Sequence, residues 1–273
     1  MGKISSRISE RNKHVKLNGG KSYCLICGRL DKLSVNHVPP RCATLLRDIE
    51  QFHAAEWFDI DVNETLKGVR SKTGSSFKTI CRGCNSLLGQ FDSELGALCE
   101  TARNRIYSYF NSFSSIGTAL FLKCDVTAVM RSVVGHMISA TSTDECLRSP
   151  NDGPYWKPLR DFVLNGGVCE THDFYCWFYP YRQSLSAKNV SFFNDGHIAL
   201  VTVLSFYPFS FLAVQRDQGI YPYHAQRISL TSEGVSLDLT SAGFRYARFP
   251  FHGLEGNQMQ AHHNSHCIVS IPK

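Results

Sequence analysis

The chain has 273 residues, a formal net charge of +6, and 43% hydrophobic and 12% aromatic residues. This length and apolar content predict a globular protein with a buried core, arranged as one large domain or two small ones. Its apolar runs fall well short of the about 18 residues of a membrane span, and the polar start of the chain lacks a signal-peptide core. We therefore expect a cytoplasmic protein without a membrane partner.

Residues 1–21 are predicted to form a basic arm. They hold six lysines and arginines against one acid, Glu10, so the arm carries +5 of the net charge. Such an arm is typical of proteins that contact the phosphate backbone of nucleic acid. A disordered solubilising tail has the same composition, so the arm alone leaves both interpretations open.

Two Cys-x2-Cys pairs are the strongest signal in the sequence. One is followed directly by Gly28 and the other by Asn85. Four thiolates in two such pairs provide all the ligands of a tetrahedral structural Zn²⁺ site. The 53 residues between the pairs predict an insertion between the two halves of the site. The predicted zinc ligands are Cys24, Cys27, Cys81 and Cys84.

The segment between and after these pairs resembles a known family. The run Asn36–His37–Val38–Pro39–Pro40 lies between them, and Cys84–Asn85 continues as far as Asp92. This order is similar to the zinc-bearing branch of the HNH endonucleases over about residues 20–97. The resemblance implies a ββα-metal module at residues 22–97, in which a β-hairpin and a helix surround one catalytic divalent ion. No resemblance extends to residues 98–273, which we expect to form an accessory domain.

The resemblance assigns a role to three residues. His37 matches the general base that activates water against the scissile phosphate. Asn85 matches a ligand of the catalytic Mg²⁺ or Mn²⁺, and Asn36 matches the position of an anionic ligand of the same ion. A neutral imidazole suits the base at physiological pH, and a divalent ion neutralises charge on the phosphoryl group. The implied activity is hydrolysis of DNA phosphodiester bonds.

The sequence departs from the family pattern in two places. Asn36 stands where a carboxylate is usual, and its amide oxygen brings no charge to a hard cation. The middle Asn of the motif is missing before the second cysteine pair, which leaves Asn63 as the candidate further away. Asp92 and Glu94 could supply the missing charge, but they open the predicted helix, where a capping role for Asp92 is favoured.

The remaining sequence predicts an α+β fold, with two helices and then an antiparallel β-rich region after the zinc-bound module. Apolar residues recur at helical spacing from Asp92 to about Phe110 and from Asp125 to Ala140, where His136 is expected to be a hydrogen-bonded core residue. A short helix is expected around Leu159–Leu164. Aromatic and β-branched runs predict strands. These strands are Phe174–Tyr179, His197–Leu204 and Phe209–Val214.

Two further groups of residues invite a metal or redox interpretation. The cysteines outside the two pairs are scattered and odd in number, which indicates reduced core thiols. A histidine cluster near the end of the chain suggests a second metal site, but an exposed loop is the favoured interpretation. Its members are His262, His263 and His266.

Three functions remain open from the sequence. The first is a metal-dependent DNA endonuclease, of a kind found in bacterial or phage conflict systems. The second is a zinc module that binds nucleic acid without cleaving it, and the third is a nuclease whose substrate is RNA. Self-association and a regulatory partner protein are further expectations that the sequence leaves open.

Overall fold

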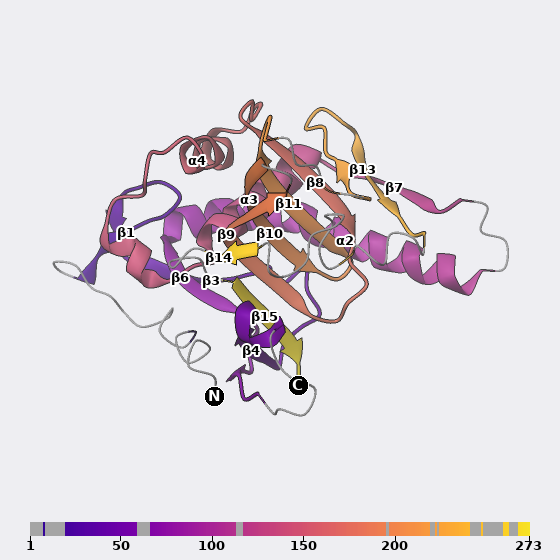
Figure 1. Cartoon of the computed structure of the whole chain (residues 1–273), viewed down its shortest axis with the longest axis horizontal. Coiled ribbons are helices and arrows are strands. Elements are labelled where there is room, and N and C mark those ends of the chain that lie inside the picture. The colour runs from indigo at the N-terminus through magenta and orange to yellow at the C-terminus, as the bar shows by residue number, and fades with distance from the viewer. Residues whose placement is uncertain are drawn as a thin grey trace.

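The computed structural model describes residue 8 and residues 20–58, 66–112, 117–194, 197–218, 222, 224–240, 247, 259–261 and 267–273. These residues combine helices with a large antiparallel sheet (Figure 1), which confirms the mixed α and β class. The helices are α1 (Ala54–Phe58), α2 (Arg82–Asn111), α3 (Val126–Ser139), the 3-10 helix η3 (Thr143–Leu147) and α4 (Trp156–Asn165).

The large sheet has the strand order β12-β8-β11-β10-β9-β15-β4-β5, and β14 pairs with β9. The strands predicted after residue 170 are confirmed as β8, β10 and β11. The strands of this sheet are β4 (Ile49–His53), β5 (Val69–Ser71), β8 (His172–Phe178), β9 (Ser184–Asn194), β10 (His197–Phe206), β11 (Phe209–Gln215), β12 (Gln226–Arg227), β14 (Met259–Ala261) and β15 (Cys267–Pro272).

Three strand pairs lie outside the large sheet: β1 with β2, β3 with β6, and β7 with β13. The pair β3–β6 leads directly into α2, because β6 ends where α2 begins. Two antiparallel strands and a helix therefore follow one another around the second cysteine pair. The bounds are β1 (Ser22–Tyr23), β2 (Leu30–Asp31), β3 (Leu33–His37), β6 (Ser76–Cys81), β7 (Ala119–Lys123) and β13 (Gly234–Asp238).

Side chains on both faces of the large sheet are buried. Along β8, Phe174, Cys176 and Phe178 join the core that also contains the helices, whereas Tyr175 and Trp177 join a second core. This alternation follows from the two-residue period of a strand. The aromatic residues of β8 therefore pack in the interior on both faces of the sheet.

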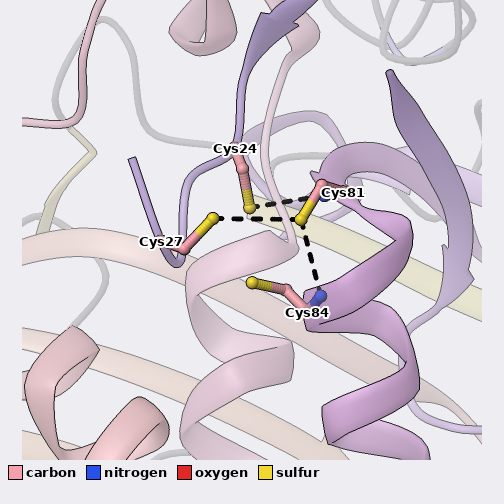
Figure 2. A group of neighbouring side chains, drawn as sticks. All are labelled: Cys24, Cys27, Cys81 and Cys84. Carbon is pink, nitrogen blue, oxygen red and sulfur yellow. Dashed lines mark hydrogen bonds between the residues drawn. The ribbon is translucent and has the colours of Figure 1, made fainter. Parts of the chain in front are cut away.

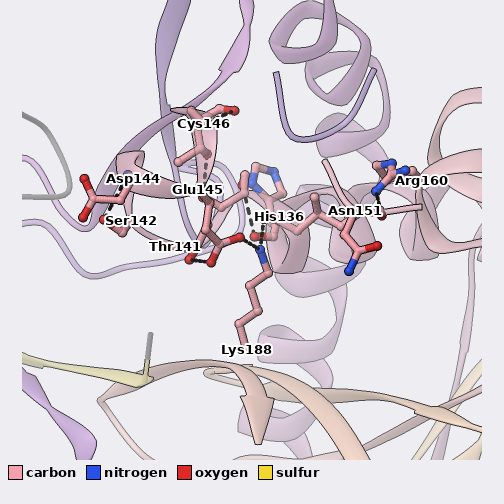
Figure 3. Close-up of polar contacts among 12 residues, drawn as sticks. His136, Thr141, Ser142, Asp144, Glu145, Cys146, Asn151, Arg160 and Lys188 are labelled. Atoms are coloured by element: carbon pink, nitrogen blue, oxygen red, sulfur yellow. Dashed lines mark hydrogen bonds and ion pairs between the residues drawn. The ribbon is translucent and has the colours of Figure 1, made fainter. Parts of the chain in front are cut away.

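Helix α3 packs against α2 on one side and against β9 and β10 on the other. Its predicted bounds are nearly correct, because Asp125 is its N-cap and accepts a hydrogen bond from the Ala128 backbone. A buried lysine joins the end of α3 to the sheet (Figure 3): Lys188 Nζ of β9 donates to the Ile138 carbonyl of α3 and lies 2.7 Å from Glu145 Oε2 of η3. The ion pair offsets part of the free-energy cost of burying this charged lysine.

Helix α2 begins ten residues earlier than predicted. The sequence pattern placed its start at Asp92, but the helix runs from Arg82, with Cys81 as its N-cap. Gly83 and Gly89 have low helix propensity, which obscures the first turns in the sequence. Asp92 thus lies inside the helix, and the capping role predicted for it is wrong.

The insertion between the cysteine pairs contributes two strands to the large sheet. Strand β4 pairs with β15 in the register Gln51↔Ser270, and the side chains of these two residues are hydrogen-bonded at 3.0 Å. The predicted boundary after residue 97 lies inside α2. One hydrophobic core contains both Leu88 and Phe211, so residues on both sides of that boundary pack together.

All eleven cysteines lie among the described residues, and all are free thiols. Outside the two pairs, the prediction of buried core thiols is confirmed for five, but Cys124 is half-buried and Cys42 is exposed. The five are Cys99, Cys146, Cys169, Cys176 and Cys267.

No helix in the described part of the chain combines the length and the apolar character needed to cross a membrane.

His172, at the start of β8, makes folding sensitive to pH. Its side chain is 1% exposed and packs edge-on against Tyr155, and burial lowers its pKa to about 4. Asp173 opposes this shift and Arg216 adds to it. Because the folded state disfavours the proton, the stabilisation is complete above pH 6.5 and is lost as the pH falls toward 4.

We expect this loss to reach about 3 kcal/mol by pH 4, since one pKa unit corresponds to about 1.4 kcal/mol. Urea midpoints measured from pH 7 to pH 4 should fall less steeply in His172→Gln than in the wild type. The exposed His224 provides the control, because His224→Gln should keep the wild-type slope. Parallel pH profiles for the wild type and His172→Gln would show that this histidine does not set the slope.

Candidate metal centre and active site

The first cysteine pair is held in a tight turn after β1. The Gly28 backbone donates to the Cys24 carbonyl at 2.9 Å, and the Cys24 backbone donates to the Arg29 carbonyl at 2.9 Å. Gly28 has φ of +71°, a conformation that glycine adopts without steric cost. This turn brings the thiols of Cys24 and Cys27 to the same side (Figure 2).

The second pair spans the junction of β6 and α2. The Cys81 thiol accepts a hydrogen bond from the Cys84 backbone at 3.5 Å, which caps the helix. The Cys81 backbone in turn donates to the Cys24 thiol at 3.3 Å. The cap and the strand end therefore fix the second pair against the first, although 53 residues separate them in the sequence.

The four sulfur atoms form a compact group. All lie within 4.8 Å of one another, and the Cys27 and Cys81 sulfurs are 3.8 Å apart. This separation is too long for a disulfide bond of about 2.05 Å. It matches the edge of a tetrahedron with metal–sulfur bonds of about 2.3 Å. The four cysteines predicted from the sequence therefore come together in a cluster that can hold a metal ion such as zinc.

The thiols of this cluster influence one another's ionisation. A hydrogen bond with the Cys84 thiol lowers the pKa of Cys24 to about 5, and the same hydrogen bond raises the pKa of Cys84. Burial raises the pKa of Cys81. Four thiolates this close together repel one another, so the donor set suits a divalent cation that compensates their charge.

Asn36 and His37 lie at the end of β3 that is distant from the cysteine cluster. In the pairing with β6, Leu33 lies opposite Cys81, whereas His37 lies opposite Ser76. Asn36 is 3% exposed and donates from Nδ2 to the Ser139 hydroxyl of α3 at 2.8 Å. Its Oδ1 is buried and has no hydrogen-bond partner.

The half-buried His37 borders a surface pocket. Burial lowers the pKa of its imidazole, and the nearby Arg41 and Arg47 lower it further. Its Nδ1 is buried without a hydrogen-bond partner. The neutral ring, with an unpaired nitrogen, is the form that accepts a proton.

Asn85 lies in the first turns of α2 and reaches back to β3. Its Nδ2 donates to the Val35 carbonyl at 3.1 Å. This contact places the Asn85 side chain beside the strand that carries Asn36 and His37. All three predicted active-site residues therefore lie on or beside β3, but Asn36 faces α3 whereas His37 faces the surface pocket, because successive strand residues point to opposite faces.

The carboxylate of Asp92 is hydrogen-bonded to two side chains of α3. Its Oδ1 accepts hydrogen bonds from the Ser132 hydroxyl at 2.7 Å and from His136 Nε2 at 2.9 Å. His136 is 2% exposed, so the prediction that it is a hydrogen-bonded core histidine is confirmed. This long-range pairing explains why Asp92 lies inside α2 rather than at its start.

The amide side chains fit an oxygen-preferring cation in one respect. In both Asn36 and Asn85, Nδ2 donates a hydrogen bond to the protein. This hydrogen bond fixes the orientation of the side-chain amide. The carbonyl oxygen Oδ1 of Asn36 is left buried and unpaired. Amide oxygen is a ligand that Mg²⁺ accepts, although it brings no charge.

Several predicted residues fall outside the part of the chain that the structure describes. These are Asn63, the histidines of the C-terminal cluster and nearly all of the basic arm. Arg41 and Arg47 lie beside His37 and were not predicted from the sequence, although Arg41 directly follows the two prolines. No family model, curated protein or solved structure matches this chain. The function therefore has to be inferred from the residues themselves.

Proposed function

We propose that this protein is a zinc-containing nuclease that hydrolyses DNA phosphodiester bonds with the help of a divalent cation. The supporting observation is that Asn36 and His37 lie on β3 and that Asn85 of α2 contacts the middle of the same strand, whose pairing with β6 leads into the cluster of four cysteines. The order of these elements agrees with the resemblance to HNH endonucleases.

Zinc is assigned to the four cysteines as a structural ion. It would connect the turn after β1 to the start of α2 and so hold β6 in place beside β3. The chemistry belongs to the other end of the strand pair. His37 borders the pocket and would take a proton from the attacking water there, because burial and the nearby Arg41 lower the pKa of its imidazole and so favour the neutral ring.

Asn36 and Asn85 would hold Mg²⁺ or Mn²⁺ through their amide oxygens. The contribution of such an ion, when bound, is charge neutralisation at the phosphoryl group and at the leaving oxygen. The interaction of Asn36 with Ser139 and that of Asn85 with Val35 would keep both oxygens oriented.

Nicking of supercoiled plasmid by the purified full-length chain tests this proposal. We expect nicking with added Mg²⁺ or Mn²⁺ and none without a divalent cation. An RNA substrate run in parallel distinguishes a DNA nuclease from an RNA nuclease. Tight DNA binding without cleavage under any metal condition would favour the second candidate, a zinc module that binds nucleic acid without cleaving it.

Asn36→Asp is expected to improve the metal site. A carboxylate at this buried position adds the charge that the amide lacks, so half-maximal nicking should require about tenfold less Mg²⁺. Titrating Mg²⁺ against nicking rate for both forms measures this shift. Asn111→Asp adds the same charge at the exposed end of α2 and should leave the titration unchanged. An unchanged titration in Asn36→Asp would remove Asn36 from the metal site.

A further inference from the structure

The pocket beside His37 is built by the insertion between the cysteine pairs. Its walls come from the chain after β3, from the turn before β6 and from the start of β9, and it is a small depression that opens to the surface. The lining residues include three basic side chains and four hydroxyl side chains, and none is acidic. They are His37, Arg41, Arg47, Thr44, Thr73, Ser75 and Ser184, with Pro39, Leu46, Ile49 and Gly74.

The arginines of this pocket have no carboxylate partner among the described residues. Arg47 donates to the Arg41 backbone carbonyl at 3.1 Å, and both side chains are exposed. The nearest acid in sequence, Asp48, is instead paired with Arg70 at 2.7 Å. Two guanidinium groups without counter-charges produce a positive potential in the pocket, as the lowered pKa of His37 also indicates.

The hydroxyl groups add hydrogen-bond donors. Thr44 Oγ1 accepts from the Leu46 backbone at 3.2 Å, which leaves its own O–H available to donate. Ser75 and Ser184 are largely buried, at 8% and 5% exposure. Guanidinium and hydroxyl donors without a competing carboxylate form the donor set that proteins use for phosphate.

The pocket is held in shape by its own backbone. The Gly74 amide donates to the Arg47 carbonyl at 2.7 Å, and the Val38 amide donates to the Ser75 carbonyl at 3.0 Å. Arg103 of α2 further binds the Ala43 carbonyl at 3.0 Å. The backbone that carries the donors is therefore held in place, which reduces the entropy lost on binding.

We infer that Arg41 and Arg47 bind a phosphate of a nucleic-acid strand in this pocket, so that an adjacent phosphodiester is presented to His37. That this phosphate belongs to a nucleic-acid strand rests on the proposed function. The donors and the positive charge of the pocket favour phosphate independently of that function. Both arginines belong to the insertion, which gives that segment a role in holding substrate.

Binding is tested with the double variant Arg41→Gln/Arg47→Gln of the full-length chain. Fluorescence anisotropy on a labelled DNA duplex, without added divalent cation, reports affinity while hydrolysis is prevented. We expect Kd to rise about tenfold or more near 100 mM salt. The slope of log Kd against log salt should fall by about 1, because each phosphate that is no longer neutralised removes about 0.9.

The matched control is Lys123→Gln/Arg148→Gln, which removes the same charge from two exposed positions outside the pocket. It should retain the wild-type salt slope. Equal slopes and affinities for the two double variants would overturn the proposal, because the effect would then be net charge alone. Both double variants should melt like the wild type, since all four side chains are exposed.

The outcomes separate this proposal from the proposed function. A pocket variant that loses binding supports the phosphate site even if the wild type never nicks plasmid. A pocket variant that binds and nicks like the control overturns the phosphate site and leaves the nuclease intact. Inorganic phosphate is a further probe: if it raises the melting temperature only when the arginines are present, while the salt slope on DNA does not depend on them, the pocket binds free phosphate and not a strand.

Discussion

Cys81→Ser is expected to abolish cooperative folding of the N-terminal third of the protein. Cys81 ends β6, caps α2 with its thiol and lies 3.8 Å from the Cys27 sulfur. Structural zinc in small modules contributes about 10–16 kcal/mol, which is comparable to the whole stability of a typical domain. Removing one ligand should therefore release the metal and separate the first cysteine pair from the helix.

Metal analysis and thermal unfolding of purified protein test this expectation. The wild type should contain one zinc ion per chain and unfold in a cooperative transition, whereas Cys81→Ser should contain none and show no such transition. Cys42→Ser is the matched control, since Cys42 is an exposed cysteine outside the cluster. A wild type purified without chelator and free of zinc would contradict the assignment, as would a Cys81→Ser variant that melts like the wild type.

The extent of unfolding in Cys81→Ser carries additional information. Helix α2 begins at this residue and continues past residue 97, and one core contains Leu88 together with Phe211. Unfolding of the module that contains the four cysteines should thus expose apolar surface of the large sheet as well. We expect the fluorescent dye ANS to bind the variant and not the wild type, because partly unfolded states expose hydrophobic surface.

The local features of this fold could be predicted from sequence. Each cysteine pair spans only four residues, and the strands β8, β10 and β11 are dense in aromatic and β-branched side chains. Such signals act over short distances along the chain. The position of His37 at a strand end follows from the two prolines after it, which end the strand pairing.

Features that depend on distant contacts could not be predicted. Nothing near Gln51 in the sequence indicates that it pairs with Ser270, which lies 219 residues away. Likewise, Asp92 has the local features of a helix cap, but its partners Ser132 and His136 are on another helix. Tertiary pairing overrode the local preference at this position.

His37→Ala is expected to lower the nicking rate by about 100-fold or more, the range typical for loss of a general base. The side chain is half-buried and caps no helix, so zinc content and melting temperature should stay near the wild-type values. DNA affinity should also be retained, since binding is assigned to other cationic groups. His224→Ala, at an exposed histidine, is the control and should cleave like the wild type.

Chemical rescue makes this test specific for a proton-accepting role. His37 borders an open pocket, so added imidazole can reach the space that the alanine leaves. Imidazole should restore part of the nicking rate of His37→Ala, with a rate that rises with the concentration of its neutral form, because only that form accepts a proton. Imidazole should not restore a variant that has lost a metal ligand, such as Asn85→Ala. If His37→Ala nicks at the wild-type rate, His37 is not the base and has no part in the mechanism.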